Sequence, residues 1–139
     1  MKGQCLCGAV RVDAPDAREI GACHCGYCRR WGGGGPMLAV HCGTGVRFEG
    51  ADQIGVFASS DWAERAFCHR CGTHLYYKLL PTGEFFVPAG LFDTDDFEIT
   101  QQIYIDKKPD FYDLANQTPV MTEAQVLAQF APPGDATAG

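Results

Sequence analysis

The sequence predicts a mainly β protein made of antiparallel sheets, with one short helix near the C-terminus. Short segments in which apolar and polar residues alternate recur along the chain, as expected of strands with one buried face. Gly, Pro, Asp and Asn separate these segments at short intervals, which is typical of turns between antiparallel neighbours. With 17 glycines, 8 prolines and 46% hydrophobic residues, the composition fits a folded, loop-rich domain.

The clearest predicted strands are 10–13 and 46–49, where apolar and charged residues alternate strictly. Less regular alternation predicts further strands at 53–58, 63–67, 73–80, 84–87 and 99–105. The tripeptide 81–83, Pro-Thr-Gly, separates two aromatic-rich runs and therefore predicts a hairpin turn.

The predicted helix begins after Thr122. Thr122 can cap its N-terminus, and Gln125, three residues later, completes a capping box. Val126, Leu127 and Phe130 then share one face, so we expect a short amphipathic helix.

The 139 residues suit one domain, which we place at 1–131. The last residues, 132–139, contain prolines and glycines but no large apolar side chain. Because such a segment has nothing with which to bury itself, we expect a flexible tail there.

The formal charge is -6 with only 11 Lys and Arg, which disfavours binding to nucleic acid or to an anionic membrane and favours small-molecule or protein partners. The N-terminus lacks the apolar run of a signal peptide, and no segment is long enough to span a bilayer. We therefore expect a cytoplasmic location, where a reducing environment favours metal binding by cysteines over disulfides.

The eight cysteines fall into groups whose spacing is typical of metal sites. The groups are Cys5-x-Cys7, Cys23-x-Cys25-x-x-Cys28, a lone Cys42, and Cys68-x-x-Cys71. The last of these precedes Gly72, which can adopt the positive φ that a cysteine knuckle needs.

Two pairings of these groups are possible. Joining Cys5 and Cys7 to Cys68 and Cys71 gives a closed site of four thiolates and leaves the triplet with one open position. Joining the triplet to the last pair would leave the N-terminal pair alone. We favour the first pairing, because closed zinc sites are structural and open ones are catalytic. Iron of the rubredoxin type would accept the same four ligands.

Three blocks resemble the glutathione-dependent formaldehyde-activating enzyme family, which also includes centromere protein V. The blocks are Gly3-x-Cys5-x-Cys7-Gly8, Cys23-His24-Cys25-x-x-Cys28-Arg29-Arg30, and, after Ser60, Arg65-x-Phe67-Cys68-x-x-Cys71-Gly72-Thr73-x-Leu75. The segment 103–113 is also similar to the family's C-terminal part.

The resemblance implies a β-rich fold that holds two zinc ions per chain. The first, structural zinc would bind Cys5, Cys7, Cys68 and Cys71, and the second would bind Cys23, Cys25 and Cys28. The reaction that it implies is the condensation of glutathione with formaldehyde to S-hydroxymethylglutathione.

From these residues we infer a carbon-sulfur lyase-type enzyme in which Cys23, Cys25 and Cys28 form the catalytic site. A zinc ion with three thiolates is more suited to binding a sulfur ligand than to acidifying water, so a substrate thiol would take the fourth position and add to a small aldehyde. The alternative is a non-catalytic zinc-stabilised binding domain of the same fold.

The candidate substrate-binding residues are Arg29, Arg30, Gly33 and Arg65. Each arginine can either balance the charge of a zinc-thiolate centre or bind a carboxylate of the thiol. Gly33 lies in a run of four glycines that either forms a tight turn or offers bare backbone to a ligand.

Other residues favour structural roles. In an extended segment, His24 points away from the metal that its neighbours share, and Cys42 is best interpreted as a small buried residue. His41, His69 and His74 are also expected to be structural. A thioredoxin-like dithiol at Cys25-x-x-Cys28 would need a βαβ context that the sequence does not predict.

Overall fold

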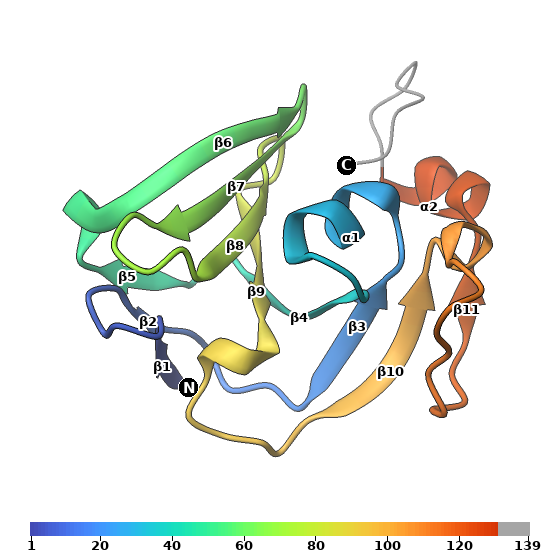
Figure 1. The fold of residues 1–139 in the computed structure, drawn as a ribbon, viewed down its shortest axis with the longest axis horizontal. Coiled ribbons are helices and arrows are strands. Elements are labelled where there is room, and N and C mark those ends of the chain that lie inside the picture. The colour runs from blue at the N-terminus through green and yellow to red at the C-terminus, as the bar shows by residue number, and fades with distance from the viewer. Residues whose placement is uncertain (131–139) are drawn as a thin grey trace.

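The computed structural model describes residues 1–130, apart from the side chain of Phe130, and they fold into two β-sheets with two α-helices (Figure 1). The predicted flexible tail, 132–139, lies outside the described residues. No helix in the described part of the chain is long and apolar enough to cross a membrane.

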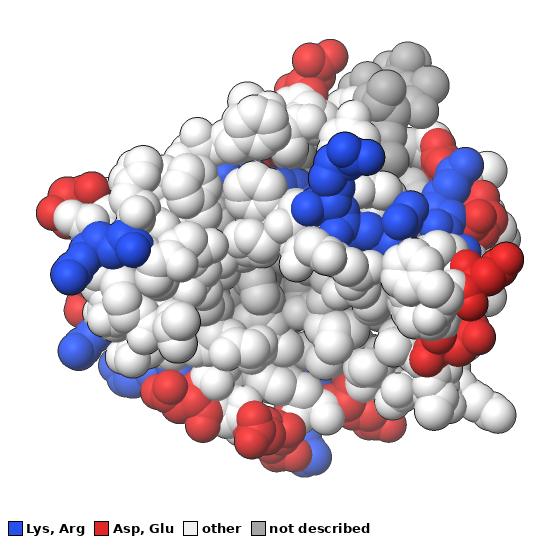
Figure 2. All heavy atoms as spheres, in the orientation of Figure 1, with Lys and Arg blue, Asp and Glu red and all other residues white. Residues whose placement is uncertain are grey.

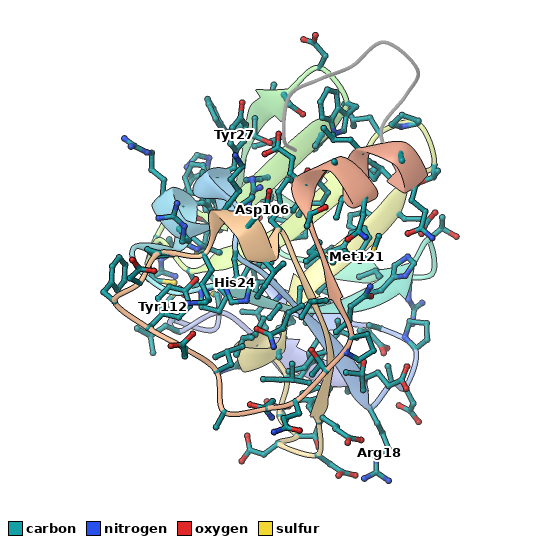
Figure 3. The ribbon with its side chains drawn as sticks, turned by 90° about the vertical axis from the view of Figure 1, so that its right-hand side faces the viewer. Arg18, His24, Tyr27, Asp106, Tyr112 and Met121 are labelled. Carbon is teal, nitrogen blue, oxygen red and sulfur yellow. The ribbon has the colours of Figure 1, made fainter. Side chains whose placement is uncertain are left out.

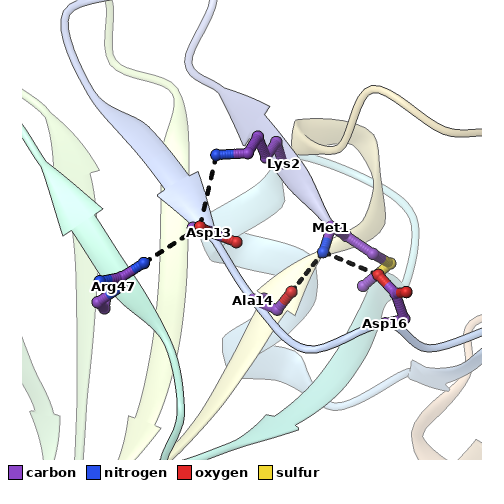
Figure 4. A network of polar contacts seen from close by, with 6 residues as sticks. All are labelled: Met1, Lys2, Asp13, Ala14, Asp16 and Arg47. Carbon is purple, nitrogen blue, oxygen red and sulfur yellow. Dashed lines mark hydrogen bonds and ion pairs between the residues drawn. The ribbon is translucent and has the colours of Figure 1, made fainter.

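The smaller sheet holds the N-terminal residues. Its strands are β1 (Lys2–Gln4), β2 (Arg11–Asp13) and β5 (Arg47–Glu49), in the order β1-β2-β5, and all its pairs are antiparallel. The carboxylate of Asp13 lies 3.5 Å from Lys2 Nζ and 3.4 Å from Arg47 Nη2, which joins the three strands on one face (Figure 4). Lys2 and Arg47 lower the pKa of Asp13.

The larger sheet has eight strands in the order β11-β10-β3-β4-β9-β8-β7-β6. They are β3 (Glu19–Cys23), β4 (Met37–Gly43), β6 (Ile54–Ser60), β7 (Ala63–Cys68), β8 (His74–Leu79), β9 (Glu84–Pro88), β10 (Glu98–Ile103) and β11 (Val120–Met121).

One α-helix lies against the middle of the large sheet and the other lies at its β11 edge. Helix α1 (Gly26–Gly32) follows β3 and contacts β4, and α2 (Glu123–Phe130) contacts β11 (Figure 1). Three short 3-10 helices complete the fold: η1 (Ala51–Gln53), η2 (Ala89–Leu91) and η3 (Ile105–Lys107).

Every predicted strand is present, with its ends shifted by a few residues, and β8 and β9 form the predicted hairpin around the turn at 81–83. The predicted helix is α2. Its capping box is formed: the amide of Thr122 donates to Gln125 Oε1 at 2.8 Å, and the amide of Gln125 donates to Thr122 Oγ1 at 3.3 Å.

The mainly β class is confirmed, but antiparallel pairing throughout is wrong. Strand β10 pairs in parallel with both β3 and β11. It comes from the C-terminal part of the chain and lies beside β3, far from it in sequence, so no short turn dictates its direction.

Four strands and one helix were not predicted from the sequence: β1, β3, β4, β11 and α1. Helix α1 has glycine at both ends, which hides its helical character, and β4 lies in the middle of the large sheet, where alternation is weak.

The main core lies between the two sheets. Val12 of β2 packs in one cluster with Val40, Leu75 and Val87 of the large sheet. The cysteines Cys5 and Cys68 belong to the same buried cluster, so the first cysteine group sits where the two sheets meet.

Candidate metal centres and the cleft between them

The structure brings together four cysteines that are far apart in sequence. Cys5, Cys7, Cys68 and Cys71 form the first cluster, in which all sulfur atoms lie within 4.8 Å of one another. The Sγ atoms of Cys5 and Cys7 are 3.6 Å apart, and those of Cys7 and Cys68 are 3.8 Å apart. A tetrahedral ion with metal-sulfur bonds of about 2.3 Å requires about 3.8 Å between sulfurs, so this donor set fits a metal.

Two similar turns supply these ligands. After Cys5, the amide of Gly8 donates to the Cys5 carbonyl at 3.0 Å; after Cys68, the amide of Gly72 donates to the Cys68 carbonyl at 2.8 Å. Gly8 and Gly72 both have φ of 78°, a conformation that other residues rarely adopt. The positive φ expected at Gly72 is therefore present, with a counterpart at Gly8.

Thr73 connects the two turns of the first cluster. Its Oγ1 lies 3.1 Å from Cys71 Sγ and accepts the amide hydrogen of Leu6 at 3.1 Å. The contact with the Thr73 side chain lowers the pKa of Cys71 to about 5. The thiolate is therefore favoured at Cys71, whereas desolvation and hydrogen bonds with the neighbouring cysteines raise the pKa of Cys7 to about 11.

The second cluster consists of Cys23, Cys25 and Cys28, whose sulfur atoms also lie within 4.8 Å of one another. Cys23 ends β3, Cys25 caps the N-terminus of α1, and Cys28 lies in the first turn of that helix. The amide of Cys28 donates to Cys25 Sγ at 3.3 Å. Hydrogen bonds from the thiols of Cys23 and Cys28 lower the pKa of Cys25 to about 3.

The second cluster is not a thioredoxin-like site. Strands β3 and β4, on either side of α1, pair antiparallel, whereas a βαβ unit joins parallel strands. Three close thiol groups fit a soft metal ion that keeps one position for another ligand.

Arg65 of β7 lies against the second cluster. Its Nη1 and Nη2 atoms are 3.7 and 3.6 Å from Cys28 Sγ, and its guanidinium group also lies over the ring of Tyr77 at 5.0 Å. Arg65 is 1% exposed, so its charge faces the cysteines and not solvent. This placement suits the charge balance expected for an arginine near metal thiolates.

His24 lies between Cys23 and Cys25 of the second cluster in sequence, but its side chain points toward Tyr112 (Figure 3). Its Nδ1 is 2.7 Å from the Tyr112 hydroxyl and its Nε2 is 2.9 Å from Gln102 Oε1. It belongs to neither cysteine cluster, as expected, but it is fully buried and joins β3 to β10 and to the loop that carries Tyr112.

A cleft of about 570 Å³ separates the two clusters and borders both of them. Figure 2 shows it as a hollow in the centre of one face, with uncharged side chains around it. Its lining includes Cys5 of the first cluster and Cys28 of the second. The remaining lining residues are Gln4, Leu6, Trp31, Gly32, Pro36, Met37, Leu38, Thr73, His74, Tyr76, Pro88, Gly90, Leu91, Phe92 and Asp93.

The predicted substrate-binding residues do not line this cleft. The guanidinium group of Arg65 lies against Cys28 Sγ. The Nε of Arg29 donates to the His24 carbonyl at 3.0 Å, and Arg30 is exposed on the same helix. Gly33 ends α1 in a left-handed conformation, and its amide donates to the Arg29 carbonyl at 2.8 Å.

Cys42 and His41 contact other residues of the sheet and belong to neither cysteine cluster. Cys42 is buried on β4, its Sγ lies 3.5 Å from the Val40 carbonyl, and burial raises its pKa to about 11. His41 contacts Glu84 and stacks on Phe86.

Cys5 and Cys28 were predicted site residues, but the sequence did not indicate that His74 and Trp31 line a cleft beside them. His74 packs against Trp31, with ring centroids 4.9 Å apart, and both border the cleft. The one available signal was the position of Trp31, three residues after Cys28.

The fold and the two clusters define a mainly β protein with two cysteine sites that can hold metal ions, one with four ligands and one with three, on either side of one cleft. Residues 1–107 match the family model described as glutathione-dependent formaldehyde-activating enzyme. The chain belongs to this family.

Two known proteins are similar to the chain. An uncharacterized lyase of Schizosaccharomyces pombe is 36% identical over 129 residues, which cover 91% of this chain and 93% of the relative. A crystal structure of a Rhodobacter sphaeroides protein is similar with a TM-score of 0.58 and 25% identity, covering 67% of this chain and 88% of the other.

Proposed function

We propose that the protein is a zinc-dependent carbon-sulfur lyase-type enzyme that adds a thiol, such as glutathione, to formaldehyde or another small aldehyde. The observation that carries this proposal is the difference between the clusters: the first brings four cysteines together, whereas the second brings together only three, one of which, Cys28, lines the cleft. Membership of the family and the lyase relative support it.

In this proposal each chain binds two zinc ions. Cys5, Cys7, Cys68 and Cys71 hold a structural ion, and Cys23, Cys25 and Cys28 hold the catalytic one. A metal with three protein thiolates supplies a position where a substrate thiol binds as its thiolate, the nucleophilic form.

The chain's own residues then have distinct tasks. Arg65 balances the negative charge of the cysteine thiolates through its contact with Cys28. Arg29 and Arg30 of α1 lie next to the same cluster and offer cations for the carboxylates of the thiol. Gly33, exposed at the end of α1, lets such a ligand approach the backbone closely.

The experiment is exchange NMR of glutathione and formaldehyde, which measures adduct formation with and without protein. The wild type is expected to raise the exchange rate above the spontaneous reaction, and Cys25→Ser is expected to return it to that level. Cys42→Ala, which changes a cysteine outside both clusters, is the matched control and retains the rate. Equal rates for wild type and Cys25→Ser at saturating protein would end the enzyme proposal.

A second candidate is a non-catalytic zinc-stabilised binding domain. It is favoured by the burial of the second cluster, where Cys25 and Cys28 are 1% and 5% exposed. Metal analysis separates the two: two metals per chain, with thiol-dependent spectral changes after cobalt substitution, support the enzyme. One metal per chain supports the binding domain.

A further inference from the structure

The cleft between the clusters lacks the cationic side chains that an anion-binding site would have. Among its lining residues there is no lysine or arginine, and the acidic residue Asp93 disfavours an anionic ligand. Apolar side chains such as Leu6, Trp31 and Leu91 make up more of its walls than polar side chains such as Gln4 and Thr73. Such a surface binds by excluding water from an apolar ligand.

The cleft is also much larger than formaldehyde requires. Its volume of about 570 Å³ lies within the range of pockets that enclose drug-sized ligands, of about 300 to 1,000 Å³. Formaldehyde has a single carbon atom and no apolar body, so it would leave the walls in contact with water.

Trp31 gives the cleft a fixed aromatic wall. Its ring stacks on Phe57 at 6.3 Å, meets the edge of Phe67 at 6.2 Å and lies 4.9 Å from His74. A ring held by three others is ordered before a ligand arrives, which lowers the entropic cost of binding. Leu6, which is 87% exposed, adds an apolar side chain that a ligand would cover.

The cations near the second cluster lie outside this cleft. Arg29 and Arg30 are on α1, and Figure 2 shows Lys and Arg side chains gathered over that helix beside the hollow. An anionic thiol such as glutathione therefore has cations to bind on the helix side, whereas the cleft offers it none. The apolar cleft is left for the other reactant.

Building on the proposed function, we infer that the cleft binds the aldehyde, and that this aldehyde has an uncharged, apolar body larger than formaldehyde. The thiol sulfur forms a bond to the carbonyl carbon beside Cys28. The π electrons of the carbonyl move to its oxygen, which takes up a proton equivalent to the one that the thiol releases, so the adduct forms without oxidation or reduction.

The test compares hexanal with 6-oxohexanoate, which has the same chain length but ends in a carboxylate. With glutathione and the metal-containing protein, exchange NMR is expected to give a half-saturating concentration for hexanal about tenfold below that for 6-oxohexanoate, because the cleft can bury the terminal methyl group but not a carboxylate. Saturation-transfer NMR without thiol measures binding of each aldehyde independently of turnover.

Two pairs of variants locate the binding. Leu6→Arg, at an exposed cleft position, is expected to reverse the preference toward 6-oxohexanoate, whereas Leu80→Arg, exposed but outside the cleft, retains it. Trp31→Ala is expected to weaken hexanal binding about tenfold, since much of the apolar contact is lost. Phe111→Ala, an exposed aromatic outside the cleft, is its control.

The outcomes are distinct. If no aldehyde reacts faster with protein, the proposed function fails. The cleft assignment is then decided by saturation-transfer NMR: selective, Leu6-dependent binding of hexanal supports it, and absence of hexanal binding overturns it. If formaldehyde reacts faster but hexanal neither binds nor reacts, the enzyme stands and the apolar aldehyde is wrong. If saturation-transfer NMR shows Leu6-dependent binding of butanethiol but not of hexanal, the cleft binds the thiol and the assignment is overturned.

Discussion

The guanidinium group of Arg65 lies against the sulfur of Cys28, with its two terminal nitrogens 3.7 and 3.6 Å from Sγ. The two residues come from different elements, β7 and α1, and both are buried. Because three thiolates around a divalent ion leave a net negative charge, a buried cation at this distance stabilises the loaded cluster. The contact also connects α1 to the strand that leads to Cys68.

Arg65→Gln is therefore expected to weaken metal binding at the second cluster about 10- to 100-fold, the usual effect of removing a partner of a metal ligand. The first cluster is expected to keep its affinity. Competition with a chromophoric chelator, followed as two successive metal losses, measures both. Arg47→Gln, an exposed cation on β5, is the control, and an unchanged second affinity in Arg65→Gln would contradict the charge-balance role.

The two clusters are expected to differ in what their loss does to the fold. Cys5 and Cys68 lie in the main core where the two sheets meet, so Cys68→Ser removes a connection worth on the order of 10 kcal/mol when a structural metal is bound. Cys25→Ser affects a smaller cluster beside α1 and α2. Circular dichroism is expected to show an unfolded or strongly destabilised Cys68→Ser and a folded Cys25→Ser. Similar melting curves would contradict the division into structural and functional sites.

Gly3 is required by a close backbone approach. A Cβ atom there would lie 2.1 Å from the Leu91 carbonyl oxygen, where Gly3 bridges to Phe92. Because backbone must move to relieve this clash, Gly3→Ala is expected to lower the free energy of unfolding by about 1 to 3 kcal/mol. Denaturant unfolding measures the loss. Gly90→Ala, where a Cβ meets nothing within 4 Å, is the matched control and is expected to be near neutral.

The two cysteine clusters were predictable from the sequence, because the spacing of their cysteines is typical of residues that gather around one ion. The sequence left two pairings open, and the structure brings Cys5 and Cys7 together with Cys68 and Cys71, which is the pairing that we favoured. Strands such as β2 and β5 were equally visible, since each alternates between a buried and a solvent-facing side.

The cleft and the parallel strand were not predictable in the same way. Trp31 and Leu38 border one space only because α1 returns to β4 after four glycines, and no local pattern encodes that path. Likewise, β10 lies beside β3 through contacts between residues about 80 positions apart, such as Glu98 with Glu19. Spacing rules describe ligands of one ion well, but they do not describe how distant segments enclose a cavity.

His24 is expected to secure the loop at 108–119 without binding metal. It reaches Tyr112 at 2.7 Å and Gln102 at 2.9 Å, and the Gln102 amide in turn donates to the Thr118 hydroxyl at 3.3 Å. His24→Ala would leave the buried Gln102 side chain and the half-buried Tyr112 hydroxyl without this partner, which is expected to cost on the order of 3 kcal/mol. Tyr112→Phe removes one contact and is expected to cost about 1 kcal/mol.

The readout for His24 is amide hydrogen exchange combined with metal analysis. The amide of Gln102, which donates to the Pro119 carbonyl at 3.1 Å, is expected to exchange faster in His24→Ala and less so in Tyr112→Phe, because the loop opens locally. Metal content is expected to equal that of the wild type in both variants. Loss of one metal per chain in His24→Ala alone, with the loop still protected, would show instead that His24 is a ligand of the second cluster.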